Sequence, residues 1–205
     1  LDLLINNAGI MHVPFDLTED GFEQHIGVNH LSHFLLALLL TPALEQGTSA
    51  RVVSVSSGAH RVSAWNAEDP HYARRSYNPG VAYGQSKTAN ALFALGYDRR
   101  FRDKGIRAFS LMPGVIETPL LRHIQEDTLV GMKKMLAASI KTPEEGAATI
   151  VWAAIGHELD GHGGLYLENC AQAVPADPAD MNQGVADHAL DPDAFRGRDG
   201  RKSVV

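Results

Sequence analysis

Four short apolar runs, each continuous rather than alternating with polar residues, constrain the fold of this 205-residue chain most strongly. They cover residues 3–5, 51–55, 106–111 and 164–167, and stretches with helical spacing separate them. A strand that is apolar along its length is buried on both faces, which is typical of a parallel sheet covered by helices on either side. The chain is therefore predicted to be an α/β protein.

Three helices are predicted between these strands. The first runs from about residue 18 to 40, and its apolar stripe includes Phe22, Ile26, Asn29, His33 and Ala37. The second covers residues 81–102 and is expected to end before Gly105, which suits a left-handed cap. The third begins at Thr142, where Thr-Pro-Glu-Glu combines an N-cap, a first-turn proline and a glutamate three residues after the cap.

Two segments, residues 57–80 and 113–141, are too long to be simple connections and are expected to form binding loops or a lid. Met132 and Met135 in the second segment favour an adaptable apolar pocket. His60 and His71 in the first segment are expected to be solvated loop residues, with contact to a substrate as the alternative.

Composition argues against several classes of partner. The formal charge is -6 and the basic residues are scattered, so no nucleic-acid surface is predicted. The longest apolar run, residues 34–40, is far shorter than the roughly 20 residues that span a bilayer. His30 and His33 are three residues apart, but no carboxylate or cysteine completes a metal-ligand set at a recognisable spacing. No metal is predicted, and the single cysteine, Cys170, is expected to be a buried small hydrophobic residue.

Tyr83 and Lys87 are the first candidates for chemistry. They are four residues apart on a predicted helix, so both side chains project from one face. A fixed positive charge near a phenol favours the phenolate and lowers a pKa that is otherwise about 10. The pair is therefore suited to proton transfer, although an exposed structural pair has the same spacing.

Ser56 and Ser57 directly follow the predicted strand 51–55, at the end of a parallel strand where α/β sheets bind ligands. A hydroxyl there can hold a carbonyl oxygen, or it can cap a turn. Asn29 lies on the apolar stripe of the first helix, and a buried amide needs hydrogen-bond partners. It is therefore either a satisfied core residue or part of a polar relay.

Two further strand ends carry small or turn-forming residues that let a backbone approach a ligand closely. Asn6-Asn7-Ala8-Gly9 follows the first strand, and Pro113-Gly114, with Thr118 four residues beyond, follows the third. Each signal is weak by itself. Their order along the chain, each where an α/β sheet places its ligand groove, favours one shared site.

In this order, Asn-Asn-Ala-Gly, Val-Asn-His, Val-Ser-Ser, Tyr-Gly-Gln-Ser-Lys and Pro-Gly-x-x-x-Thr closely resemble the short-chain dehydrogenase/reductase family. Within it, residues 29–36, 56–60 and 83–90 resemble the retinol-dehydrogenase-like branch. The resemblance covers residues 1–193 and implies the C-terminal portion of a single three-layer domain with a Rossmann-like, doubly wound parallel sheet. Residues 194–205 are expected to be a flexible tail.

The resemblance implies an oxidoreductase that uses NAD or NADP to interconvert a small, apolar alcohol and carbonyl. Tyr83 matches the general acid/base, and Lys87 matches the residue that lowers its pKa and holds the nicotinamide ribose. Ser57 matches the substrate-carbonyl donor and Asn29 the proton-relay asparagine. Positions that match cofactor-binding residues are Asn6, Ala8, Gly9, Tyr83, Lys87, Pro113, Gly114, Val115 and Thr118. A cytoplasmic homodimer or homotetramer is the implied form of the full-length protein.

The family opens with a glycine-rich turn and further strand-helix units that have no counterpart in this sequence; at about 30 residues per βαβ unit, about 70 residues are expected to precede residue 1. The choice between NAD and NADP is therefore not readable, and the chain is expected to be poorly stable alone. A fragment of a complete enzyme is the favoured hypothesis. One alternative is a truncated, non-catalytic protein that dimerises through the small-residue face of the Tyr83 helix or binds another partner. The epimerase and dehydratase branch, which usually adds a larger C-terminal substrate domain, is the other.

Overall fold

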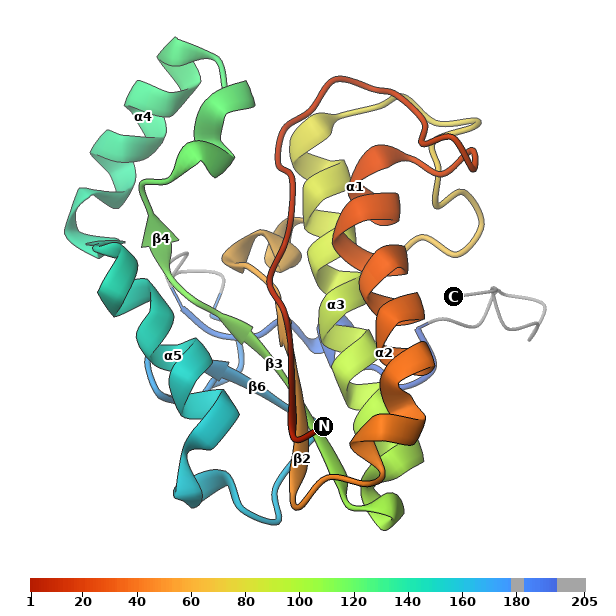
Figure 1. The fold of residues 1–205 in the computed structure, drawn as a ribbon. Coiled ribbons are helices and arrows are strands. Elements are labelled where there is room, and N and C mark those ends of the chain that lie inside the picture. The colour runs from red at the N-terminus through yellow and green to blue at the C-terminus, as the bar shows by residue number, and fades with distance from the viewer. Residues whose placement is uncertain (178–182, 195–205) are drawn as a thin grey trace.

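A five-stranded sheet lies at the centre of the computed structural model, which describes residues 1–177 and 183–194 (Figure 1). Its spatial order is β1 (Leu3–Asn6), β2 (Ala50–Val55), β3 (Ile106–Met112), β6 (Leu165–Glu168) and β7 (Ala171–Gln172). The first four strands are parallel, and β7 pairs antiparallel with β6. The four strands predicted from continuous apolar runs are confirmed, each to within one residue at either end.

Helices cover both faces of the sheet and produce three layers (Figure 1). On one face, α2 (Ser32–Leu44) and α3 (Pro79–Phe101) form an apolar core with the strands, and on the other face α5 (Pro143–Ile155) forms a second core. Neighbouring residues of β2 serve opposite cores, since Val52 packs towards α3 and Val53 towards α5. The α/β, Rossmann-like architecture is therefore confirmed. The flexible tail expected from residue 194 lies almost wholly outside the described residues, and the domain limits stay a prediction.

The second long segment folds into structure of its own. It contains α4 (Glu126–Leu136) and a small parallel pair made by β4 (Val115–Ile116) and β5 (Ile140–Lys141). Figure 1 places α4 beyond the carboxyl ends of the main strands, apart from α3. The side chains of Met132 and Met135 lie outside the described part of the chain.

Two helix boundaries follow from local signals in the sequence. Thr142 and Glu145 form the reciprocal capping box: Glu145 N donates to Thr142 Oγ1 at 3.2 Å, and Thr142 N donates to Glu145 Oε2 at 2.8 Å. Gly105, with a φ of 79°, closes the chain after α3 in the left-handed conformation. Both predicted boundaries are confirmed.

The start predicted for the first helix is wrong. Instead of residue 18, α1 begins at Gln24 and comprises Gln24–Ile26, followed by a π-helical turn, Gly27–Leu31, and then α2. Thr18 N donates to Phe22 O at 2.7 Å, so the residues before Glu23 form a closed turn. The Glu23 carboxylate then accepts hydrogen bonds from the backbone of His25 and Ile26 and caps the helix.

The continuous helix Gln24–Leu44 is longer than the apolar run seen in the sequence. By length and composition it could cross a membrane, a test that a helix in a protein core also passes. Its packed face combines the apolar residues of the core with polar contacts to α3, where Asn29 bonds Ser86 and His30 lies beside Asn90. These contacts are typical of a helix packed against protein.

Cys170 is exposed, so the prediction of a buried thiol is wrong. Asn169 and Cys170 have φ values of 50° and 54° and form the turn that joins β6 to β7. A residue at such a turn lies outside the apolar layers, which explains the error.

Candidate active site

Tyr83 and Lys87 lie near the start of α3, where Pro79 occupies the first turn and the Asn78 side chain accepts a hydrogen bond from Val81 N at 3.0 Å. Both are buried, with 6% and 4% of their surface exposed, so the exposed structural pair is excluded. Lys87 Nζ donates to Val55 O at 3.0 Å and lies 5.6 Å from the centroid of the Tyr83 ring.

Burial dominates the titration of this pair. It raises the pKa of Tyr83 to about 12, while the neighbouring Ser57 hydroxyl lowers it by a smaller amount. It also lowers the pKa of Lys87 to about 8. Desolvation of the phenol and the Ser57 hydroxyl set the pKa of Tyr83, and the expected lowering by Lys87 is not seen in this structure. At neutral pH Tyr83 carries its proton and Lys87 remains mostly charged.

The two consecutive serines have different surroundings. Ser56 is buried and its hydroxyl donates to Lys87 O at 2.8 Å, so it fixes α3 to the end of β2. Ser57 is partly exposed, caps the 3-10 turn Gly58–Val62 through Ala59 N at 3.2 Å, and lies beside the Tyr83 phenol. The geometry therefore brings the second serine, as expected, to the tyrosine.

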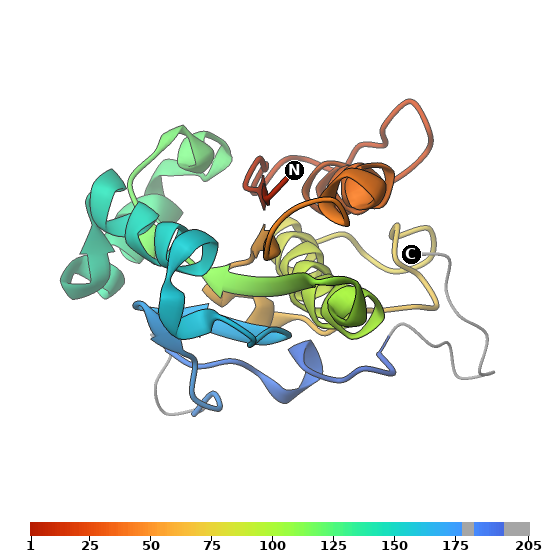
Figure 2. The same ribbon diagram turned by 60° about the horizontal axis from the view of Figure 1, so that its bottom comes forward.

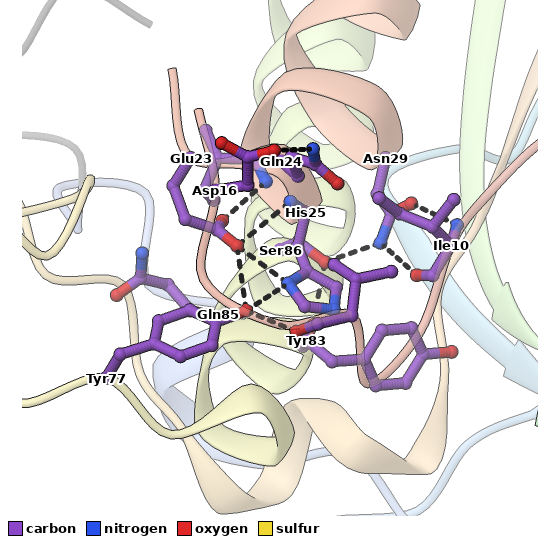
Figure 3. A network of polar contacts seen from close by, with 12 residues as sticks. Ile10, Asp16, Glu23, Gln24, His25, Asn29, Tyr77, Tyr83, Gln85 and Ser86 are labelled. Atoms are coloured by element: carbon purple, nitrogen blue, oxygen red, sulfur yellow. Dashed lines mark hydrogen bonds and ion pairs between the residues drawn. The ribbon is translucent and has the colours of Figure 1, made fainter. Parts of the chain in front are cut away.

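Asn29 ties the loop after β1 to α3 (Figure 3). Its Oδ1 accepts from Ile10 N at 2.8 Å, and its Nδ2 donates to Ile10 O and to Ser86 Oγ, each at 3.0 Å. Ser86 Oγ in turn donates to Tyr83 O at 2.7 Å. Asn29 is fully buried within the π-helical turn, a feature that is frequent at functional sites and that the sequence did not indicate.

Gly9 brings the end of β1 against the same side chains. A Cβ at this position would lie 3.1 Å from Asn29 Oδ1 and 3.6 Å from Lys87 Nζ, so a side chain there would fill the space in front of the ammonium. Asn6 is buried and its amide donates to His33 O at 3.5 Å, whereas Ala8 is exposed. Of the first-strand candidates, Gly9 is the one beside Lys87.

Residues 113–118 follow β3 at the same edge of the sheet, because β2 and β3 are parallel neighbours. Pro113 leads into Gly114, whose φ of 113° suits glycine and whose added Cβ would lie 2.7 Å from Lys141 Cδ. Val115 belongs to β4, and Thr118 caps the turn that follows by accepting from Leu120 N at 3.4 Å. The conformation of this loop is thus set by its packing against Lys141, by the pairing of β4 with β5 and by the Thr118 cap.

The Lys87 ammonium provides a test of whether these residues fit a nicotinamide nucleotide. It has three donor hydrogens and, within the part of the chain that the structure describes, one hydrogen-bond acceptor, Val55 O. Buried donors need acceptors, and the absence of a side chain at Gly9 leaves room in front of the ammonium. The arrangement fits the hydroxyl groups of a nicotinamide ribose. It does not extend to a phosphate site.

A cavity of about 450 Å³ lies between residues 12–14, residues 78–80 and residues 123–128. Ile124 lines it and also packs with Met11 and Tyr83 in an apolar cluster. Partly buried members of this cluster are Ala59, Leu120, Leu121 and Leu129. Ile124 therefore connects the cavity to the apolar cluster that contains Tyr83, and the cavity volume is in the range of small-molecule sites.

A buried carboxylate network, which sequence reasoning missed, supports this cavity (Figure 3). Glu23 Oε1 lies 2.7 Å from His25 Nδ1 and 3.3 Å from the Tyr77 hydroxyl, which also donates to Val13 O at 2.9 Å. Burial raises the pKa of Glu23, but hydrogen bonds from His25 and Ile26 outweigh it and leave the pKa below its usual value. The ring of His25 lies 6.1 Å from that of Tyr83.

The small-residue face of α3, considered above as a surface for dimerisation, is buried inside this chain. Ala82, Ala89 and Ala91 are at most 1% exposed. A Cβ added at Gly84 would lie 2.6 Å from Ala59 O. The hypothesis that the protein dimerises through this face is therefore wrong.

His30 and His33 are buried between α2 and α3 rather than arranged around a metal. Burial lowers the pKa of each to about 4, so both are neutral at pH 7. Among residues 1–177 and 183–194, no group of three His, Cys, Asp or Glu side chains could hold a metal ion.

Comparison with known proteins identifies the family. The model of the short chain dehydrogenase family matches residues 1–129, more than half of the chain. The protein belongs to the short-chain dehydrogenase family. The predicted membership is confirmed, whereas the retinol-dehydrogenase-like branch stays a prediction.

Individual relatives agree with this assignment. A Streptomyces lividans protein described as a probable oxidoreductase is 46% identical over 204 residues, which cover 95% of this chain and 68% of that protein. The polyprenol dehydrogenase of Mus musculus is 47% identical over 181 residues, which cover 85% of this chain and 54% of the mouse protein. A crystal structure of an uncharacterized Mycobacterium Paratuberculosis protein is 36% identical, with a TM-score of 0.68 over 93% of this chain and 61% of that one. The chain thus spans about half to two thirds of its relatives.

Proposed function

We propose that this protein is an NAD(P)-dependent oxidoreductase that interconverts an alcohol and a carbonyl on an apolar small molecule, with Tyr83 as general acid and base. The observation that carries the proposal is the setting of the Tyr83 phenol. It is buried beside the Ser57 hydroxyl and in an apolar cluster with Met11 and Ile124, and the Lys87 ammonium is buried next to it.

The residues have complementary parts in the proposed reduction. Ser57 donates a hydrogen bond to the substrate carbonyl oxygen, and Tyr83, which holds its proton at neutral pH, donates that proton to the same oxygen. The nicotinamide supplies the hydride to the carbonyl carbon when it is bound. This donation leaves a phenolate at Tyr83, which the positive charge of Lys87 stabilises, and in the reverse reaction the phenolate takes up the hydroxyl proton of the alcohol.

The cofactor is NAD or NADP, the class implied by family membership. Lys87 and Gly9 would hold its nicotinamide ribose, with Asn29 fixing the loop around Gly9. Residues 113–118, at the adjoining strand end, would border the nicotinamide. An apolar substrate is supported by the cluster around Tyr83 and by the name of the mouse relative, polyprenol dehydrogenase. The likeness to retinol dehydrogenases, a cytoplasmic location and a homodimer or homotetramer belong to the same proposal.

Tyr83→Phe tests the proposal because it removes the phenol hydroxyl and leaves the ring in its apolar cluster. We expect turnover of a panel of apolar ketones and alcohols to fall by about 10³-fold or more, the upper range for loss of a general acid. Cofactor affinity, measured by fluorescence titration with NADH and NADPH, should change little. Wild-type turnover in this variant would contradict the assignment of Tyr83.

The same titration separates the proposal from a non-catalytic partner-binding role. An oxidoreductase binds at least one of the two reduced cofactors and consumes it in stoichiometric amounts with a ketone. An epimerase or dehydratase regenerates its cofactor and gives no net consumption. Failure to bind either cofactor would favour partner binding.

A further inference from the structure

His60 lies one turn beyond Ser57 and is fully buried, so the expectation that it is a solvated loop residue is wrong. Its Nδ1 is 2.6 Å from Ser57 O, and its Nε2 is 3.1 Å from Ala186 N. These two partners are separated by more than 120 positions in the sequence. The imidazole therefore joins the turn that carries Ser57 to the C-terminal part of the domain.

The partners fix the position of the imidazole proton. A backbone N–H can only donate, so Nε2 must accept from Ala186 and carries no hydrogen. A carbonyl oxygen can only accept, so Nδ1 must carry the hydrogen that it shares with Ser57 O. His60 is therefore a neutral imidazole in its Nδ1–H form.

Ser57 O is held from three directions. It accepts from His60 N at 3.1 Å and from His60 Nδ1 at 2.6 Å, and the Tyr166 hydroxyl donates to it at 3.2 Å. The Tyr166 ring also lies against that of His60, with 4.8 Å between centroids. These contacts set the plane of the peptide after Ser57 and so restrict where its own hydroxyl lies.

The C-terminal segment, residues 184–189, is attached through several of the same groups. His188 Nε2 lies 2.8 Å from His60 O, and Arg61 donates to Gly184 O at 3.1 Å. Val185 and Ala189 pack in an apolar cluster with Tyr166. Figure 2 shows this part of the chain, in blue, running below the sheet and α3 in that view.

We infer that His60 is a positioning residue: its Nδ1–H holds the Ser57 backbone, and with it the substrate-carbonyl donor, while its Nε2 clamps residues 184–189 to the same turn. The inference rests on the proposed function in assigning that role to Ser57. His60 itself touches neither the Tyr83 hydroxyl nor the space in front of Lys87 in any contact that the described residues make; it acts through the Ser57 backbone.

The clamp works only while His60 is neutral. Added at Nε2, a second proton would face the Ala186 N–H and break that contact. The ionisable groups that face His60 are Tyr166 from β6, Arg61 from its own turn and His188 from the C-terminal turn. Burial lowers the pKa of His60 to about 4, with Arg61 and His188 acting in the same direction, so the clamp is closed at neutral pH.

The first test requires no catalysis. ¹⁵N NMR of the histidine-labelled protein should show His60 protonated at Nδ1 and unprotonated at Nε2, with no change between pH 8 and about pH 5, because the neutral form is favoured by burial. His60→Gln identifies its signals by their loss. A hydrogen on Nε2, or an imidazolium at pH 7, would overturn the clamp.

The second test uses two amides that each reproduce one nitrogen of the imidazole. His60→Asn can place an N–H at the Nδ1 position and so keeps the bond to Ser57 O, whereas His60→Gln can place an acceptor oxygen at the Nε2 position and keeps the bond to Ala186. We expect His60→Asn to recover most of the turnover that His60→Ala loses. His60→Gln should stay roughly tenfold or more below wild type in kcat, the scale of a small misplacement in an active site, with unchanged cofactor affinity.

Hydrogen exchange should rank the two amide variants in the opposite order to kcat. Exchange at residues 184–189 should accelerate in His60→Asn and remain slow in His60→Gln. Thr88→Val is the matched control, because it removes a hydroxyl that donates to Ser63 O at 2.7 Å and to His60 O at 3.1 Å without changing the imidazole. It should lower the melting temperature and leave kcat near that of wild type.

The outcomes separate this inference from the proposed function. Equal losses of kcat in His60→Asn, His60→Gln and Thr88→Val, in proportion to lost stability, would reduce His60 to a general structural role and overturn the inference. A wild-type protein without turnover on any alcohol or carbonyl would instead contradict the proposed function. In that case the NMR and exchange results still decide whether the clamp exists.

Discussion

The surroundings of α3 and the edge formed by β1 differ in how far their side chains are buried and paired. Around α3, polar side chains are buried and bonded: Asn29 has three hydrogen bonds, and Ser56 and Lys87 have acceptors in the main chain. Along β1, which pairs with β2 alone among the described strands, Ile5 is 40% exposed, and Leu39 on the adjoining α2 is 69% exposed.

The difference shows which part of the site this chain specifies by itself. The groups proposed for proton transfer are held by contacts from within the chain, so their arrangement is already formed. The β1 side presents Gly9 and an apolar surface that the described residues do not cover. Proton transfer and cofactor binding should therefore respond differently to mutation.

Among the variants that compare these two regions, Lys87→Met should have the largest effect. It removes a buried cation for which the described residues provide no carboxylate, so the free energy of unfolding should stay the same or rise. Turnover should fall by about 10²-fold or more, because the phenolate of Tyr83 loses its stabilising charge and the ribose loses a donor. Steady-state kinetics and urea unfolding would measure the two changes. Parallel loss of activity and stability would contradict the division described above.

Ser57→Ala should lower kcat by about 10²-fold, as is usual when one donor to a developing oxyanion is lost. The matched control is Ser56→Ala, which removes the hydrogen bond to Lys87 O and should cost about 1 kcal/mol of stability while most turnover remains. Kinetics with one ketone substrate, together with the melting temperature of each variant, would separate the two serines. The reverse order of effects would assign the role to Ser56.

Acid should destabilise the protein through its buried histidines. Burial lowers the pKa of His30, His33 and His60 to about 4, whereas an unfolded histidine titrates at about 6.5. The unfolded state therefore takes up protons first, and stability present above pH 7 is lost as the pH falls towards 4. Each such histidine adds a slope of about 1.4 kcal/mol per pH unit. Urea unfolding at pH 7, 6 and 5 measures the slope; a flat profile would contradict the buried neutral state.

Leu39→Gln should have the smallest effect, within about 0.5 kcal/mol of wild type, because most of the side chain is exposed. Its benefit should appear as slower aggregation, measured by light scattering. Leu44→Ala on the same helix is the buried comparison and should cost about 2–5 kcal/mol. Similar losses for both would mean that the surface around Leu39 is covered in solution.

Local signals in the sequence account for much of this structure. Continuous apolar runs predicted the four parallel strands, and Thr142 with Glu145 predicted a helix start, because these features depend on residues close together in the chain. The relative order of Ser57, Tyr83 and Lys87 also indicated one site, since parallel strands end at one edge of a sheet.

Contacts between distant residues account for what could not be predicted. The Glu23 carboxylate that begins the first helix also contacts Tyr77, 54 positions away, and the π-helical turn accompanies the contacts of Asn29 with Ile10 and Ser86. The burial of His60 depends on Tyr166 and Ala186, more than a hundred positions away. No short window of sequence contains these partners.

The contacts of the Glu23 carboxylate also connect two segments of the cavity wall. It caps α1 and shares with Val13 O the single hydrogen of the Tyr77 hydroxyl, which lies 3.3 Å from the carboxylate and 2.9 Å from the carbonyl. Val13 stands between the lining residues His12 and Pro14, and Tyr77 directly precedes the lining residue Asn78. Both walls are therefore connected to the Glu23 carboxylate through Tyr77, so a bulky ligand that displaces one wall also disturbs the contacts of the other. We expect the two walls to move together when the cavity changes shape.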